Sequence, residues 1–213
     1  MDEKFVDLCS TKNPKARIKI MKGHFATSNS HINTYIDMST VKVQHNNCKE
    51  TAKLLAEDYI HTTAVDTIVC LEETENIGTF LAEQLADVSQ MSLSYGNNIA
   101  IVSPEYHQNG QILFRDNVQR MIKHRQVLIL APSITTGKSV KGAIEAVLYY
   151  GGAVCGICSV FSSINKINGL EVKTIFTSKD IPDYRAYTPG ACPMCKEGQK
   201  LDAIVNSYGY SKL

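Results

Sequence analysis

Residues 127–139, VLILAPSITTGKS, decide the fold class of this 213-residue chain. The four apolar residues 127–130 predict a short buried strand, a polar turn follows, and apolar residues with helical spacing begin at Ser139. In such a strand–turn–helix unit, the backbone N–H groups and hydroxyls of the turn can point to one centre at the positive end of the helix. That centre suits a phosphate, and the candidate phosphate-binding residues are Thr135, Thr136, Gly137, Lys138 and Ser139.

This turn has two other interpretations. One is an ordinary turn whose threonine and serine side chains only cap the following helix, and the residues alone favour neither this nor a phosphate site. The other is the P-loop of nucleotide triphosphatases, G-x-x-x-x-G-K-[ST], because Lys138 and Ser139 match its end. The first glycine of that pattern would fall on Pro132, which has a fixed φ and no N–H, so we reject the P-loop.

Strand and helix patterns alternate along most of the chain. Strand patterns occupy residues 67–71, 99–102, 127–130, 154–161 and 172–176, and helical patterns occupy 51–60, 77–88 and 139–150. This alternation predicts an α/β fold with a central, mainly parallel sheet of about five strands flanked by helices. We expect a single domain over 1–213, with a core at about 50–178 and a small hood from about 1–45 and 180–213.

The carboxyl ends of the predicted strands indicate where a ligand should bind. In open parallel sheets, ligands bind just beyond these ends. The turn at 135–139 lies at one of them and the loop at 72–78 lies at another. Residues 103–126 are polar and poorly periodic and carry an Asn109-Gly110 turn, so we expect a hairpin or a mobile excursion there.

Composition excludes several functional classes. The formal net charge of +1 gives no general attraction to nucleic acid or to an acidic membrane surface. The longest apolar runs have the length of strands, so we expect no membrane span. The N-terminus lacks the basic-then-apolar order of a signal peptide, which makes the cytoplasm the expected compartment. The seven cysteines are then expected to be mostly reduced thiols.

Five short motifs occur in an order that resembles one enzyme family. They are Gly23-His24-Phe25 with Ser28, His31 and Thr34-Tyr35-Ile36-Asp37; Glu72-Glu73-Thr74-Glu75-Asn76; the strand and turn at 127–139; the following helix with Gly151-Gly152 and a strand; and CPMCKEG at 192–198. In this order the chain resembles the type I phosphoribosyltransferases, and among them the orotate phosphoribosyltransferases. The resemblance spans about residues 23–200 and implies the same fold.

The resemblance also implies an activity and a set of site residues. The family reaction transfers phosphoribose from phosphoribosyl pyrophosphate to a nitrogenous base with Mg²⁺, and its orotate branch serves pyrimidine biosynthesis. A homodimer is implied as well. The implied positions are 135–139 for the 5′-phosphate, Thr74, Glu75 and Asn76 for the pyrophosphate loop, and Phe25 and Tyr35 for the hood over the base.

The chain departs from this family where members carry two acidic side chains after the central strand. Those carboxylates hold the ribose hydroxyls and stabilise an oxocarbenium-like transition state. The corresponding positions here are Ala131-Pro132 or Pro132-Ser133, and none of them is acidic. Losing one preorganised electrostatic contact typically lowers the rate by about 10²–10³-fold. Weak candidates for a catalytic role remain at Glu72, Glu73 and His107.

Two further departures weaken the orotate activity that the resemblance implies. Glu75 and Asn76 replace glycines of the pyrophosphate loop, and a carboxylate there repels the leaving group unless Mg²⁺ bridges them. Ser162-Ser163 replaces an Asp-Arg pair, so the arginine that would meet the orotate carboxylate is missing. Two functions stay open: an attenuated phosphoribosyltransferase, or a non-catalytic nucleotide-sensing or regulatory protein. Either would bind phosphoribosyl pyrophosphate or a nucleoside monophosphate.

Cysteine and histidine residues offer side candidates for metal binding. Cys192 and Cys195 have the spacing of zinc ligands, but a turn or a structural thiol pair is the favoured interpretation. Cys155 and Cys158 lie in an apolar strand, where residues three apart face opposite sides, so they are expected in the core. The histidines at 24, 31, 45, 61 and 124 show no ligand spacing and are expected to be hydrogen-bonded or solvated.

Overall fold

A computed structural model describes residues 5–87, 91–107 and 110–213 of the chain. The helices are α1 Ser39–Val43, α2 His45–Ala56, α3 Glu75–Ala86, α4 Asp116–Gln119, α5 Lys138–Tyr149 and α6 Pro193–Lys196, and Pro189–Ala191 forms a 3₁₀ turn. The strands are β1 Val6–Cys9, β2 Arg17–Ala26, β3 His31–Asp37, β4 Thr67–Cys70, β5 Ala100–Val102, β6 Glu105–Tyr106, β7 Ile112–Leu113, β8 Gln126–Ile134, β9 Ala153–Ser162, β10 Lys166–Ile167, β11 Leu170–Thr177, β12 Ala186–Tyr187, β13 Ala203–Asn206 and β14 Gly209–Lys212.

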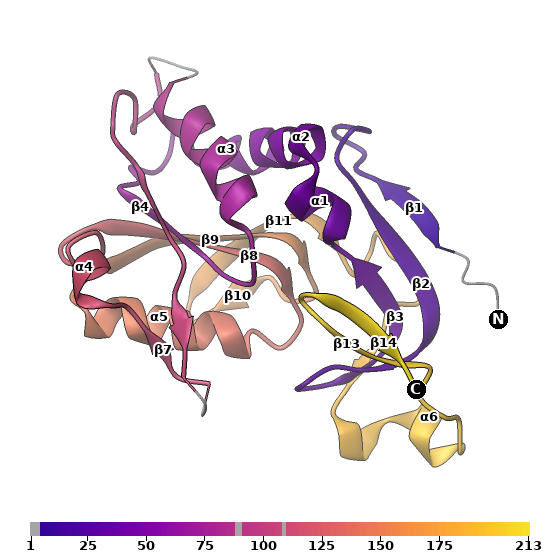
Figure 1. The fold of residues 1–213 in the computed structure, drawn as a ribbon. Helices are drawn as coiled ribbons and strands as arrows, with labels where there is room; N and C mark the ends of the chain where they lie inside the picture. The colour runs from indigo at the N-terminus through magenta and orange to yellow at the C-terminus, as the bar shows by residue number, and fades with distance from the viewer. Residues whose placement is uncertain (1–4, 88–90, 108–109) are drawn as a thin grey trace.

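The central sheet has the strand order β10-β11-β9-β8-β4-β5 (Figure 1). The strands from β11 to β5 run parallel, and only β10 is antiparallel, as the edge partner of β11. The prediction of a mainly parallel sheet of about five strands is therefore confirmed.

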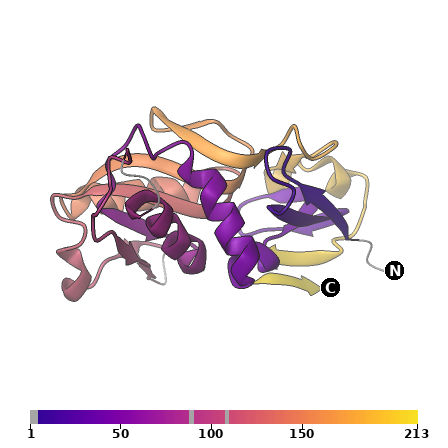
Figure 2. The same cartoon turned by 90° about the horizontal axis from the view of Figure 1, so that it is seen from above.

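Helices cover both faces of this sheet, with α2 and α3 on one face and α5 on the other (Figures 1 and 2). Strand β8 shows why both faces must be covered. Leu128 and Leu130 pack towards α2 and α3, whereas Val127, Ile129 and Ala131 pack towards α5. Because successive side chains point to opposite faces, a continuous apolar run requires apolar cover on both sides.

A second sheet joins the two ends of the chain in the order β12-β3-β2-β13-β14, with β1 paired to β2. Its strands come from the N-terminal and the C-terminal segments, which lie side by side in both views (Figures 1 and 2). Strand β13 runs parallel to β2, with Ala203 opposite Phe25 and Ile204 opposite Ala26. This sheet is the predicted hood.

Some predicted boundaries were wrong by several residues. Strand β8 runs on through the predicted turn to Ile134, because β9 continues to pair with it up to Ser162. Helix α5 begins at Lys138, and α2 occupies His45–Ala56 rather than 51–60. Helix α3 ends at Ala86, and the predicted end at Val88 lies outside the described residues.

The polar segment after β5 forms the antiparallel hairpin β6–β7, with Glu105 opposite Leu113. This confirms the hairpin prediction, although Asn109 of the predicted turn lies outside the described residues. None of the helices within the described ranges has the length and apolar character needed to cross a membrane.

Candidate functional site

A cavity of about 230 Å³ lies at the carboxyl edge of the central sheet, where the second sheet approaches it. Both sheets contribute to its wall, and so do the start of α5 and the loop that follows β4. The lining residues are Thr27, Ser28, Asn29, Ile32, Tyr35, Ile36, Met38, Ser39, Glu72, Pro132, Ser133, Ile134, Thr135, Thr136, Gly137, Lys138, Ser139, Val140, Phe161, Tyr184, Val205, Asn206 and Ser207.

The predicted phosphate turn forms one continuous part of this wall. Gly137 adopts a left-handed φ of 74° directly before α5, a conformation that glycine reaches without steric cost. The backbone N–H groups of residues 135–139 donate no hydrogen bond to any other residue that the structure describes. They therefore stand free at the positive end of α5, and Lys138 adds a cation whose ammonium lies 3.4 Å from the Asn29 side-chain oxygen.

The structure separates the two possible positions for an acidic pair. Pro132 and Ser133 line the cavity, whereas Ala131 is 2% exposed and packs in the apolar cluster beneath α5. The cavity-facing pair is therefore Pro132-Ser133, and neither residue carries a charge. This end of β8 offers a ribose only the Ser133 hydroxyl.

The loop after β4 is held by a buried lysine, Lys42, which no sequence motif distinguishes. Lys42 is 3% exposed, and its ammonium lies 3.1 Å from the Glu73 carboxylate, 3.4 Å from the Glu72 carbonyl and 2.5 Å from the Ser207 carbonyl. These contacts tie the loop to the segment that joins β13 and β14. Glu72 and Glu73 both have positive φ angles, 52° and 65°, which non-glycine residues adopt only at a cost.

Glu72 is the acidic residue of this loop that reaches the cavity wall. Burial raises the pKa of its carboxyl group, while the nearby Lys42 ammonium and the Ser139 hydroxyl oppose that rise. The carboxyl group thus sits beside the free N–H groups of the phosphate turn, where an ionised carboxylate repels a bound anion.

The side chains of the predicted pyrophosphate loop are engaged in contacts within the protein. The buried Thr74 hydroxyl donates to the Leu71 carbonyl at 2.9 Å, and the Asn76 amide donates to the Lys42 carbonyl at 2.8 Å. The Glu75 carboxylate accepts a hydrogen bond from the Ser103 hydroxyl. These three residues lie outside the cavity wall, so the structure does not bring their side chains to the phosphate turn.

Of the two aromatic residues predicted for the hood over a base, the structure brings one to the cavity. Tyr35 lines it, and burial raises the pKa of its hydroxyl to about 12. Phe25 is 1% exposed and packs behind Tyr35, with the ring centroids 6.0 Å apart. Tyr184 also lines the cavity and packs edge-on against Phe161.

The remaining catalytic and metal candidates lie elsewhere. His107 is exposed on the β6–β7 hairpin and is not part of the cavity wall. Cys158 is buried in the core, as predicted, whereas Cys155 is only partly buried and packs against the same apolar cluster. The absence of ligand spacing among the histidines was misleading, because the fold places His24 and His31 beside Cys192 and Cys195.

Comparisons with known proteins show which sequences and folds the chain resembles. No family model matches the chain. An orotate phosphoribosyltransferase of Chlorobium phaeobacteroides is 28% identical over 197 residues, which are 86% of this chain and 88% of that protein. One of Pelotomaculum thermopropionicum is 27% identical over 182 residues, covering 84% and 86% of the two chains.

Solved structures share the fold at lower identity. Orotate phosphoribosyltransferase from Aeropyrum pernix superposes with a TM-score of 0.53 at 16% identity, over 85% of this chain and 93% of that one. The Mycobacterium tuberculosis enzyme, in complex with Fe(III) dicitrate, gives a TM-score of 0.55 at 17% identity, over 78% and 93%. The chain shares the fold of the type I phosphoribosyltransferases and is similar in sequence to orotate phosphoribosyltransferases. Its similarity to the orotate branch extends over most of the phosphoribosyltransferase fold, from the second sheet to the central sheet.

Proposed function

We propose that this phosphoribosyltransferase homologue binds the 5′-phosphate of a phosphorylated ribose in the cavity, as part of phosphoribosyl pyrophosphate or of a nucleoside monophosphate. One observation carries this proposal: residues 135–139 line the cavity at the start of α5, and their backbone N–H groups donate no hydrogen bond within the described residues. A helix N-terminus with free N–H groups and an adjacent lysine is a site for a phosphate dianion.

The reaction that we propose is phosphoribosyl transfer to a nitrogenous base, at an attenuated rate. Its support is the similarity to orotate phosphoribosyltransferases, together with a fold shared with the Mycobacterium tuberculosis enzyme in complex with 5-phospho-α-D-ribosyl 1-diphosphate, at a TM-score of 0.50 and 17% identity. The attenuation follows from the uncharged Pro132-Ser133 pair. One missing electrostatic contact to the transition state lowers the rate by about 10²–10³-fold.

A catalytic role would require Mg²⁺, and the cavity offers a minimal donor set for it. Mg²⁺ is commonly held by one or two carboxylates together with the oxygens of substrate phosphates. Glu72 supplies one cavity carboxylate, whereas the Glu73 carboxylate is occupied by Lys42. When bound with its substrate, Mg²⁺ would neutralise charge on the pyrophosphate leaving group.

The alternative function is non-catalytic nucleotide sensing or regulation. The observation that favours it is the contrast between a free phosphate turn and a pyrophosphate loop whose side chains are committed to internal contacts. We also propose a cytoplasmic location, a homodimeric state and a role in pyrimidine nucleotide metabolism. These three proposals rest on the similarity to orotate phosphoribosyltransferases.

A ligand panel tests this function. Thermal unfolding is followed with UMP, AMP, inorganic phosphate, and phosphoribosyl pyrophosphate with Mg²⁺, because a ligand that binds only the folded state raises the melting temperature. Pyrophosphate release is measured in parallel with orotate, uracil and adenine. We expect stabilisation by both classes of phosphorylated ribose and slow release of pyrophosphate.

Each result has a defined meaning. Stabilisation by nucleoside monophosphates without any pyrophosphate release would favour the sensing function. Turnover as fast as that of an enzyme with both acids would disprove the attenuation. A melting temperature that none of the phosphorylated compounds changes would end the phosphate-site proposal.

A further inference from the structure

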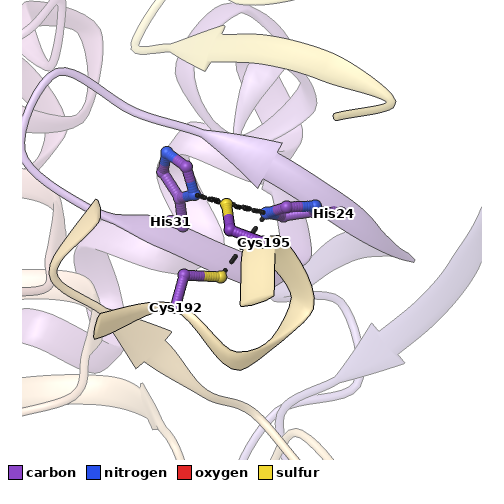
Figure 3. A group of neighbouring side chains, drawn as sticks. All are labelled: His24, His31, Cys192 and Cys195. Atoms are coloured by element: carbon purple, nitrogen blue, oxygen red, sulfur yellow. Dashed lines mark hydrogen bonds between the residues drawn. The ribbon is translucent and has the colours of Figure 1, made fainter. Parts of the chain in front are cut away.

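Four side chains with metal-binding atoms converge beneath the second sheet, outside the cavity wall (Figure 3). His24 comes from β2, His31 begins β3, Cys192 directly precedes α6 and Cys195 lies within α6. One ligand atom from each of the four lies within 4.8 Å of all the others. The segments that supply them are separated by more than half of the chain, and the pairing of β2 with β3 and β13 brings them together.

The distances within this cluster match a tetrahedral zinc site. With Zn–S bonds of about 2.3 Å and Zn–N bonds of about 2.0–2.1 Å, a tetrahedron separates sulfur from nitrogen by about 3.5 Å and nitrogen from nitrogen by about 3.3 Å. The observed distances from His24 Nε2 are 3.5 Å to Cys192 Sγ, 3.6 Å to Cys195 Sγ and 3.3 Å to His31 Nδ1. His31 Nδ1 lies 3.2 Å from Cys195 Sγ.

Hydrogen bonding among the four groups does not account for this arrangement. His24 Nδ1 lies 3.0 Å from the Gln199 carbonyl, which only accepts, so Nδ1 carries the proton in the neutral ring. His24 Nε2 then has one lone pair but three close neighbours, and one lone pair cannot accept three hydrogen bonds. A cation at the centre uses one lone pair from each of the four atoms.

The surroundings of His24 are those of a metal ligand. Histidine ligands usually donate their second ring N–H to a carbonyl or carboxylate, which fixes the orientation of the ring, and the Gln199 carbonyl takes this place. The backbone around the ring is also fixed, because His24 N–H donates to the Asp202 carboxylate at 2.7 Å and Asp202 N–H donates to the His24 carbonyl at 2.8 Å. The ring itself is fully buried.

We propose that His24, His31, Cys192 and Cys195 bind one structural Zn²⁺. Two thiolates and two imidazoles in a tetrahedron favour zinc over Mg²⁺ or Ca²⁺, which prefer oxygen ligands. Cys195 is exposed and gives the ion a path to the site. The ion fastens α6 to the β2–β3 hairpin, whose loop carries Thr27, Ser28 and Asn29 of the cavity wall. This proposal does not depend on the function proposed for the cavity.

Metal analysis of the full chain tests the proposal. The protein is produced without a histidine tag, purified under reducing conditions without chelators, and analysed by plasma mass spectrometry. We expect about one zinc per chain. After removal of zinc and reduction of the thiols, added Co²⁺ should give the intense visible absorption of a tetrahedral site and a thiolate charge-transfer band.

Matched variants separate the site from other thiols and histidines. Cys195→Ser and His31→Gln should each weaken zinc binding by at least about tenfold, since even changes in the outer shell cost about 10–100-fold. Cys9→Ser and His45→Gln alter an exposed thiol and an exposed imidazole elsewhere and should leave the zinc content unchanged. Because Cys195 is exposed, its serine variant should still fold.

The outcomes are decisive in either direction. Zinc in the wild-type protein that is lost from the two site variants and kept in the controls supports the proposal. A reduced protein that contains no zinc and gives no tetrahedral Co²⁺ spectrum overturns it. Equal zinc content in all four variants overturns it as well.

Discussion

Two loops at the carboxyl edge of the central sheet have opposite characters. After β8, residues 135–139 line the cavity, and their backbone N–H groups donate no hydrogen bond to any residue that the structure describes. After β4, the loop is secured by Lys42, and its side chains, apart from that of Glu72, point away from the cavity wall. Anion binding at a helix start needs a correctly placed backbone with N–H groups that have no other acceptor. We propose that the loop after β8 binds an anion in this way.

The largest expected effect separates the two neighbouring positions at the end of β8. Ala131→Asp should destabilise the fold by about 4 kcal/mol, because a buried carboxyl group has its pKa raised by about three units, at about 1.4 kcal/mol each. Ser133→Asp, which faces the cavity, should change the free energy of unfolding by less than about 1 kcal/mol. Urea denaturation at neutral pH measures both variants.

The two cavity-facing positions at this end of β8, Pro132 and Ser133, test the proposed ribose site. Pro132→Asp combined with Ser133→Asp should strengthen the binding of phosphoribosyl pyrophosphate with Mg²⁺ and raise any pyrophosphate release. Titration calorimetry measures the affinity. A double variant that folds but binds no more tightly would show that the ribose does not lie against this end of β8.

The next effect concerns the loop after β4. Lys42→Met should lower the free energy of unfolding by about 2–3 kcal/mol, since it leaves two carbonyls and one carboxylate without their buried partner. Lys49→Met is the matched control in α2, where the ammonium lies 3.9 Å from Glu83 in an exposed pair worth about 0–1 kcal/mol. Equal losses in the two variants would contradict the anchoring role of Lys42.

A smaller effect tests the loop after β8. Gly137→Ala should cost about 1–2 kcal/mol, because its φ of 74° is left-handed and a Cβ would lie 3.0 Å from Ile164 Cδ1. Gly169→Ala shares the left-handed conformation, at a φ of 84°, but has open space around it. Both should lower stability, and only Gly137→Ala should weaken the binding of nucleoside monophosphates in calorimetry.

The smallest effect is a pH dependence that links the two loops. Burial raises the pKa of Glu72, so the folded state keeps this proton to a higher pH than the unfolded chain does. Stability therefore falls as the pH rises from the unfolded-state pKa to the folded-state pKa, and the loss persists above both. Glu72→Gln should remove this dependence and strengthen phosphate binding severalfold at neutral pH.

Urea denaturation across a pH series, with Glu145→Gln on the exposed face of α5 as the control, measures this dependence. If the free energy of unfolding of Glu72→Gln varies with pH in parallel with that of the wild-type protein, this carboxyl group is not the source of the pH dependence.

Local sequence patterns were sufficient to predict the central sheet and insufficient to predict the rest of the structure. Apolar runs predicted the parallel strands, because each run must be buried on both faces. The extension of β8 through Pro132 was missed, since proline usually interrupts a central strand. It is tolerated here because β4 pairs with β8 only as far as Leu130, which leaves that side of Pro132 without a strand partner.

The functional residues that were not predicted from the sequence were missed for a different reason. Lysines are seldom buried, so nothing in the sequence distinguished Lys42 from the exposed lysines around it. The ligand atoms of His24, His31 and the CPMC segment meet only because β2 and β3 pair and the C-terminal segment returns beside them. Spacing within one segment carries no information on contacts between distant segments.

The parallel pairing of β13 with β2 has a consequence for biosynthesis. During translation, the N-terminal hairpin leaves the ribosome early, but the strand that completes its sheet emerges after the entire central sheet has been made. Until β13 has been synthesised, the edge of β2 that pairs with it has unpaired backbone groups. Such an edge favours aggregation and chaperone binding. The second sheet is therefore completed only after the strands of the central sheet have been synthesised.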